Sequence, residues 1–273
     1  MKLRLATDAQ PGRPNEDFAA ASADAVVLVD GAGVPAGTPT GCCHGAAWYA
    51  RTLGGLFLAA ISPARPLTDA LAEAIDRITT LHRDTCDLGH PGTPSAVVAA
   101  ARRNREQVDH LVLGDCLAVL DRRHGGPIAV TDNRLARISL GPRAAMHALP
   151  IGSPAHTAAR RELVQVEATH RNRPGGFWVA STEPHAAAEA LTGSSQADEL
   201  SAIALLSDGA ARLVEPFRLA GWADILRLLA DHGPAELIRR TRAAENDDPH
   251  GTRWPRAKAH DDATVAYWPL CAH

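Results

Sequence analysis

Four runs of apolar residues in this chain stop at an aspartate or start directly after one. AVVLVD ends at Asp30, HLVLGD at Asp115 and IALLSD at Asp208, while ATVAYW follows Asp261 and Asp262. Short apolar runs bounded by turn residues predict buried β-strands. In an antiparallel sheet the end of one strand lies beside the start of its neighbour, so acids in these positions gather at one edge. The sequence therefore predicts a sheet with carboxylates concentrated at one edge.

Further runs rich in Val, Ile and Leu alternate with segments of helical periodicity. We expect strands at 25–29, 95–101, 110–113, 117–120, 128–131, 177–180, 202–206 and 264–268. Apolar spacing predicts helices over 41–61, 67–78 and 225–229, and a fourth that begins at Pro234. The short links at 114–116 and 122–127 indicate hairpins. The chain should therefore form largely antiparallel sheets with helices packed outside them.

The overall charge excludes two classes of partner. The chain has 28 Lys and Arg against 31 Asp and Glu, a formal charge of −3, so it lacks the basic surplus that nucleic-acid binding needs. Its longest apolar run, 53–61, is far shorter than the roughly 20 residues that span a bilayer, and we expect no membrane association and no signal peptide. Five cysteines without a CxxC pair favour a cytoplasmic protein with reduced thiols.

The gathered carboxylates need a compensating charge. Two ionised carboxylates 4 Å apart repel by about 4 kcal/mol at an effective dielectric constant near 20. A shared proton could offset one pair, but four or more oxygen ligands favour a hard divalent cation such as Mg²⁺ or Mn²⁺. A single Asp-Gly pair more often only caps a loop, which remains the alternative for each aspartate taken alone. We expect Asp247-Asp248 to lie in such a solvated loop.

Six short motifs in order resemble those of the metal-dependent protein phosphatases of type 2C, the PPM family, in their bacterial form. The motifs are Asn15-Glu16-Asp17, Val29-Asp30-Gly31, Gly92-Thr93, Leu113-Gly114-Asp115, Leu206-Ser207-Asp208-Gly209 and Asp261-Asp262-Ala263-Thr264. The resemblance implies one catalytic domain over 1–273 with an α+β fold, a four-layer α-β-β-α sandwich of two antiparallel sheets flanked by helices. It also implies that 132–174 is a mobile, flap-like insertion beside the metals.

The same resemblance implies a site with two Mn²⁺ or Mg²⁺ ions that share a water and an aspartate, with a position for a third, looser ion. Asp30 would bridge the two ions and the carbonyl of Gly31 would complete the first. The other residues carried over by motif are Glu16, Asp208 and Asp261 for the second ion, Asp115 with Asp208 for the third, Asp17 to orient bound waters, and Asp262, in a place usually taken by Asn, just outside the ligands.

The implied activity is hydrolysis of phosphomonoesters, most simply as a serine/threonine protein phosphatase. Asp30 and Asp208 would carry catalysis through the metals, which lower the pKa of the shared water, and Arg13 would bind the phosphate. The substrate is expected to be a phosphorylated protein or a small phosphorylated metabolite. A catalytically weak or inactive binding protein with the same fold is the alternative.

Three departures from the family pattern support that alternative. Ala32 stands where many relatives carry a histidine, and Arg13 lies one residue closer to the Glu-Asp pair than usual. Gly33 is followed by Val34-Pro35 where further glycines are usual. Because every core ligand is retained, we favour the enzyme.

The insertion is rich in arginine, with two open interpretations. Its side chains could contact a phosphorylated partner, or they could form a solvated face. The residues are Arg143, Arg160, Arg161, Arg171 and Arg173.

A glycine pair after a strand is another candidate binding site. Gly31-x-Gly33 after a strand is typical of a dinucleotide loop, but Ala36 replaces the third glycine, and Pro35 and Pro39 block the helix that would bind pyrophosphate.

His82, Cys86 and His90 recur every fourth residue, yet Gly89 and Pro91 end the helix and a fourth zinc ligand is missing. Cys42-Cys43-His44 has no recognised metal spacing and is interpreted as packing at a helix start. No zinc site is therefore predicted.

Overall fold

The computed structural model describes residues 3–33 and 38–270 of the 273-residue chain. Val34, Pro35 and Ala36, on which the altered glycine loop and part of the dinucleotide argument rest, lie outside the described residues.

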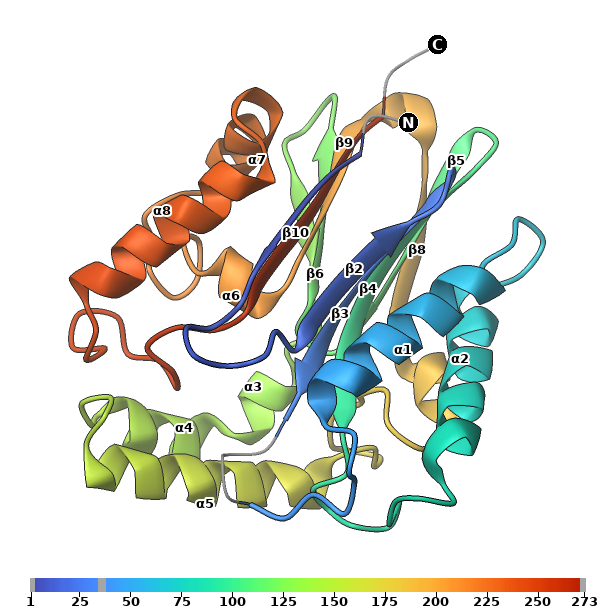
Figure 1. The fold of residues 1–273 in the computed structure, drawn as a ribbon. Coiled ribbons are helices and arrows are strands. Elements are labelled where there is room, and N and C mark those ends of the chain that lie inside the picture. The colour runs from blue at the N-terminus through green and yellow to red at the C-terminus, as the bar shows by residue number, and fades with distance from the viewer. Residues whose placement is uncertain (1–2, 34–37, 271–273) are drawn as a thin grey trace.

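Two five-stranded sheets form the centre of the molecule (Figure 1). All their strand pairs are antiparallel, as expected. The first sheet has the order β1 (Arg4–Asp8), β10 (Ala263–Pro269), β9 (Leu200–Leu206), β6 (Leu117–Arg122), β7 (Ile128–Val130). The second has the order β2 (Asp17–Ala21), β3 (Ala25–Ala32), β4 (Ser95–Asn104), β5 (Gln107–Leu113), β8 (Leu191–Gln196).

A pair of helices covers the outer face of each sheet (Figure 1). α1 (Ala46–Ala60) and α2 (Leu67–His82) pack on the second sheet, and α7 (Trp222–Asp231) and α8 (Pro234–Asp247) pack on the first. Alternation along β3 shows how the layers are sealed: Val27 and Val29 pack toward the helices, while Val26 and Leu28 pack between the sheets. The four-layer α-β-β-α sandwich is thus confirmed.

Three of the four edge strands were missed by sequence patterning. β1, β2 and β8 are absent from the predicted strands, because these outer strands are half exposed and β8 (LTGSSQ) has almost no apolar residues, whereas the edge strand β7 was predicted. The expected strand at 177–180 is wrong. That segment forms only isolated bridges, Ala96 with Ala180 and Arg171 with Phe177, although its side chains are buried.

The insertion at 132–174 is helical, where an irregular segment was expected. It contains α3 (Arg134–Ile138), α4 (Leu140–His147) and α5 (Pro154–His170), which lie across one end of the two sheets (Figure 1). Ser153 caps α5, since its hydroxyl accepts a hydrogen bond from the backbone of His156 at 3.1 Å, and Pro154 occupies the first turn. These helices bury few apolar side chains, so the sequence carries little periodicity there.

No helix in the described ranges combines the length and the apolar character needed to cross a membrane.

Candidate metal centre

Strand register brings the acidic motifs to one end of the sandwich. Asp17 lies directly opposite Asp30 across the β2–β3 pair. Asp208 follows β9, and Asp261 precedes β10, the strand that pairs with β9. Beside these two aspartates, the backbone N–H of Ser207 donates to the carbonyl of Thr264 at 3.0 Å. The antiparallel pairing therefore produces the convergence that the sequence pattern predicts.

Both Asp-Gly pairs owe their glycine to close backbone approach. A Cβ at Gly31 would lie 2.6 Å from the carbonyl oxygen of Glu16, and a Cβ at Gly209 would lie 2.0 Å from that of Asp262. No side chain fits at either distance. Glycine at these positions lets each acidic strand end pack against the neighbouring acidic segment, which is a stronger requirement than a turn alone.

Four of the expected ligands surround one cavity of about 220 Å³. Asp30 comes from the end of β3, Asp115 follows β5, Asp208 begins α6 (Asp208–Ala211), and Asp261 precedes β10. Gly31 lies on the same wall, and side chains of the helical insertion close the opposite side. Side chains from both sheets thus share this cavity with side chains of α3 and α5.

Three of the four cavity aspartates, Asp30, Asp115 and Asp208, have pKa values above their ordinary range. Burial raises the pKa of Asp115 to about 7, and the charge of Asp208 adds to the shift. Burial also raises the pKa of Asp30 well above its usual range, and the pKa of Asp208, again with help from neighbouring carboxylates. Asp17 beside them has a pKa raised to about 7, chiefly by burial.

These groups have the chemistry of a hard-cation site. Both carboxylate oxygens of Asp17 are buried without a hydrogen-bond partner in the described part of the chain. Buried carboxylates that lack donors are costly, and oxygen-rich coordination of a divalent ion is the common remedy. The donor set therefore fits Mg²⁺ or Mn²⁺, as the resemblance implies.

The carboxylates are spread more widely than the ligands of a closed metal site. Among the described residues, no three acidic side chains of this region each have an oxygen within 4.8 Å of the others. Mg²⁺ usually keeps several waters and binds through only one or two carboxylates. A cation here would accordingly reach some of these aspartates through water or draw their side chains inward.

Glu16 faces a different, smaller cleft. That cleft is lined by Arg13, Lys258 and Asp262 among others, and it shares Gly33 and Lys258 with the larger cavity. Asp262 holds this segment in place, because its two oxygens accept hydrogen bonds from the backbone of Gln10 at 2.7 Å and of Glu16 at 2.9 Å. The expected grouping of Glu16 with Asp208 and Asp261 is thus divided between two adjacent spaces.

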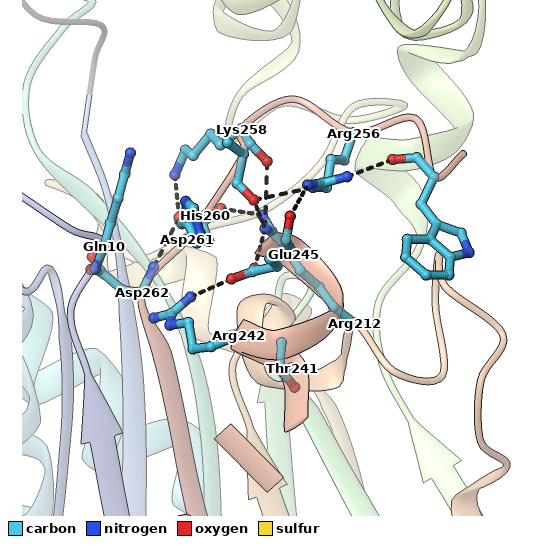
Figure 2. A network of polar contacts seen from close by, with 12 residues as sticks. Gln10, Arg212, Thr241, Arg242, Glu245, Arg256, Lys258, His260, Asp261 and Asp262 are labelled. Atoms are coloured by element: carbon cyan, nitrogen blue, oxygen red, sulfur yellow. Dashed lines mark hydrogen bonds and ion pairs between the residues drawn. The ribbon is translucent and has the colours of Figure 1, made fainter. Parts of the chain in front are cut away.

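Lys258, a residue that sequence reasoning missed, lines both the larger cavity and the smaller cleft. Figure 2 shows its contact with Asp261. The ammonium of Lys258 lies 2.5 Å from Oδ1 of Asp261, and Nη2 of Arg212 lies 3.2 Å from Oδ2. Burial alone would raise the pKa of Asp261, but these two cations outweigh it and lower that pKa. Asp261 is therefore already neutralised by the protein, unlike the other cavity carboxylates.

The cations belong to a larger buried network that anchors α8 (Figure 2). Glu245 is fully buried and bridges two arginines, with Oε1 2.5 Å from Arg212 Nη1 and Oε2 2.8 Å from Arg242 Nη1. Asp248 contacts Arg256 at 3.1 Å and accepts a hydrogen bond from the backbone of Trp254 at 2.8 Å. The expectation that Asp248 is solvated is wrong, because these donors hold it in the interior.

Basic side chains line a second cavity of about 450 Å³ next to the carboxylates. Arg13, Arg160, Arg161 and Lys258 contribute to it. Arg171 lines the carboxylate cavity itself, and Arg143 pairs with Glu167 at 2.9 Å. Of the five insertion arginines, Arg173 is exposed and lines neither cavity. Arg161 and Arg173 are exposed, as a solvated face requires, whereas Arg143, Arg160 and Arg171 are half-buried.

Comparison with known proteins identifies the fold. No protein-family model matches the sequence, and no curated protein matches it significantly. Solved structures do match. The serine/threonine phosphatase Stp1 from Staphylococcus aureus has a TM-score of 0.61 at 12% identity, covering 99% of this chain and 95% of its own.

Two mycobacterial phosphatases give similar values. The catalytic domain of PstP in complex with two manganese ions has a TM-score of 0.55 at 17% identity, covering 98% of this chain and 97% of its own. MsPP from Mycobacterium smegmatis, a PPM phosphatase in complex with cacodylate, has a TM-score of 0.57 at 18% identity, with 99% of each chain covered. The chain thus has the fold of bacterial PPM-type serine/threonine phosphatases over nearly its whole length.

Proposed function

We propose that this chain is a Mn²⁺- or Mg²⁺-dependent phosphomonoester hydrolase that acts on phosphoserine or phosphothreonine in proteins. The observation that carries the proposal is the cavity lined by Asp30, Asp115 and Asp208, all with raised pKa values, next to a basic cavity, within a phosphatase fold. Small phosphorylated metabolites remain alternative substrates.

One cation would be held by Asp30, Asp208 and Asp115, with the carbonyl of Gly31 beside them. A second cation at Glu16, Asp208 and Asp261 requires Lys258 to leave Asp261, because both oxygens of that carboxylate are engaged. Asp17 would accept hydrogen bonds from waters of the first cation, since its oxygens have no other donor in the described residues.

The chain's own cations would bind the phosphate. When bound, a divalent cation withdraws charge from the phosphoryl oxygens and lowers the pKa of an attacking water. Arg13, Arg160 and Lys258 line the adjacent cavity, where their positive charges would orient the phosphate dianion toward the carboxylates. Ala32 on the cavity wall can donate no proton, so the leaving oxygen would take its proton from water.

A binding protein without catalysis is the second candidate, and Lys258 favours it. If the lysine stays on Asp261, the protein supplies its own cation where an ion would otherwise be bound. The same basic cavity could then retain a phosphorylated partner without hydrolysing it.

Turnover of p-nitrophenyl phosphate and of a phosphothreonine peptide distinguishes these candidates. The enzyme should be active with Mn²⁺, lose activity with a chelator, and lose it in Asp208→Asn but not in Asp198→Asn, an exposed aspartate. Activity on p-nitrophenyl phosphate alone would favour a small substrate. A wild-type protein that binds the phosphopeptide with Mn²⁺ present and never releases phosphate would contradict the proposal.

A further inference from the structure

Three cysteines and a histidine converge at the end of the α1–α2 helix pair, and none of them lines the carboxylate cavity. Cys42, Cys43 and His44 precede α1, and Cys86 follows α2. The loops that carry them lie side by side in Figure 1, and the backbone N–H of Asp87 donates to the carbonyl of Gly41 at 2.8 Å. The two motifs that the sequence left as separate, non-metal features therefore meet in space.

The donor atoms are spaced as in a tetrahedral zinc site. Cys42, His44 and Cys86 form the one group of three potential ligands within 4.8 Å of one another in the described part of the chain. Cys86 Sγ lies 3.2 Å from Cys42 Sγ, and the Nδ1 atom of His44 lies 3.7 Å from Cys42 Sγ and 3.3 Å from Cys86 Sγ. Tetrahedral Zn²⁺ places two sulfurs about 3.8 Å apart and a sulfur and a nitrogen about 3.6 Å apart.

Cys43 lies beside this group of three and would supply a fourth donor after a side-chain movement toward Cys42. Its sulfur lies 3.8 Å from Cys86 Sγ and 3.5 Å from the Nδ1 atom of His44. The zinc interpretation of His82, Cys86 and His90 failed for want of a fourth ligand, and this arrangement removes that objection by using only Cys86 from that set. Three thiolates and one imidazole are a common structural ligand set for Zn²⁺.

The surroundings prepare the ligands for a cation. The indole of Trp48 stacks on the His44 ring with centroids 4.2 Å apart, which fixes the imidazole plane. The backbone N–H of His44 donates to Cys42 Sγ at 3.4 Å, which favours the thiolate, although burial outweighs this bond and raises the pKa of Cys42. Slight burial opposes ionisation of Cys86, but contact with the Cys42 thiol and nearby backbone and hydroxyl donors outweigh it and lower the Cys86 pKa to about 6.

We propose that Cys42, Cys43, His44 and Cys86 bind one structural Zn²⁺ ion, which releases the thiol protons and clips the loop before α1 to the loop after α2. The clip would close a long loop that contains both helices, and so lower the conformational entropy of the unfolded chain. It would also hold the described residues that lead into α1. The site is independent of the proposed hydrolase activity.

Cobalt substitution tests this site directly. The full chain is reduced, freed of metal with a chelator, and titrated with Co²⁺. We expect one equivalent to produce the thiolate-to-cobalt charge-transfer absorption and the strong visible bands of tetrahedral cobalt, and one equivalent of Zn²⁺ to abolish them. Asp30→Asn should give the same spectrum, because carboxylates produce no thiolate charge transfer.

The matched variants are Cys86→Ser and Cys116→Ala. Cys116 is buried between the sheets and lies outside the cluster, so its variant should keep the cobalt spectrum and one equivalent of zinc, while Cys86→Ser should lose both. His44→Ala should shift the visible bands while keeping charge transfer, which separates loss of a ligand from misfolding. Octahedral cobalt bands without charge transfer in the folded wild type, or a Cys42–Cys86 disulfide that forms in air while zinc is present, would overturn the proposal.

Discussion

Two groups of carboxylates in this sandwich differ both in their exposure to solvent and in their contacts with cations. Asp30, Asp115 and Asp208 line the cavity, and their pKa values are raised by burial. Glu245 and Asp248 belong to the buried arginine network, are more deeply buried than the cavity aspartates, and contact arginines. Among the described residues, the deeply buried carboxylates are thus paired and form a scaffold, whereas Asp30, Asp115 and Asp208 line an open cavity and form no ion pair.

The comparison assigns different roles to similar residues. A paired carboxylate is satisfied by the fold and contributes to stability, whereas an unpaired one costs stability that only a ligand or a proton can restore. Asp261 stands between the groups, since it lines the cavity and is also held by Lys258 and Arg212. Substitutions in one group at a time therefore distinguish the two roles.

Removing a cation from the paired group should have the largest effect. Arg212→Met leaves Glu245 buried with one fewer arginine and removes a cation from Asp261, so we expect a loss of about 3–5 kcal/mol in the free energy of unfolding. Urea denaturation measures it. Arg227→Met is the control, because its ion pair with Asp224 is exposed and should change stability by less than about 1 kcal/mol. Equal losses in the two variants would remove the distinction between the groups.

Removing a charge from the unpaired group should have the opposite sign. At pH 8 and without metal, Asp115→Asn replaces a half-buried carboxylate of raised pKa by a neutral amide and should stabilise the protein by about 1–2 kcal/mol. Thermal and urea unfolding report the change, with the exposed Asp76→Asn as the matched neutral substitution. Stabilisation by added Mn²⁺ should be weaker in Asp115→Asn than in wild type. A destabilised metal-free Asp115→Asn protein would contradict the account.

The pH dependence of the paired group gives the smallest effect. Hydrogen bonds from backbone N–H groups and Thr252 outweigh burial and hold the pKa of Asp248 at about 2. Because this folded pKa lies below the unfolded value, the stabilisation by Asp248 is complete above about pH 4 and is lost as the pH falls toward 2. Asp248→Asn should therefore be less stable than wild type at pH 6, and the difference should narrow in acid. A constant difference from pH 6 to pH 2.5 would show that Asp248 does not titrate in this way.

The positions of the metal-facing aspartates could be predicted because strand ends mark them in the sequence. Asp30 and Asp208 end apolar runs, and antiparallel pairing alone carries them to one edge. Lys258 and Arg212 could not be predicted, since neither belongs to a periodic pattern and their partners are chosen by tertiary packing. The edge strand β8 escaped for a related reason, because half-exposed strands need few apolar residues.

The thiol cluster shows the limit of local motifs. The sequence spacing groups Cys86 with His82 and His90. In the structure Cys86 contacts Cys42 and His44, from which α1 and α2 separate it along the chain. Ligand spacing is readable when both halves of a site lie on one element. It is hidden when packing of a helix pair brings them together.

Calorimetric titration of the metal-free protein with Mn²⁺ tests the central claim, that the unpaired carboxylates bind a divalent cation. Wild type should bind Mn²⁺, Asp30→Asn should lose that binding, and Lys258→Met should bind more tightly or take up a further ion, because Asp261 is then freed. Arg227→Met should titrate as wild type does. Wild type without measurable binding, or Asp30→Asn with unchanged binding, would contradict the assignment of this cavity as a metal centre.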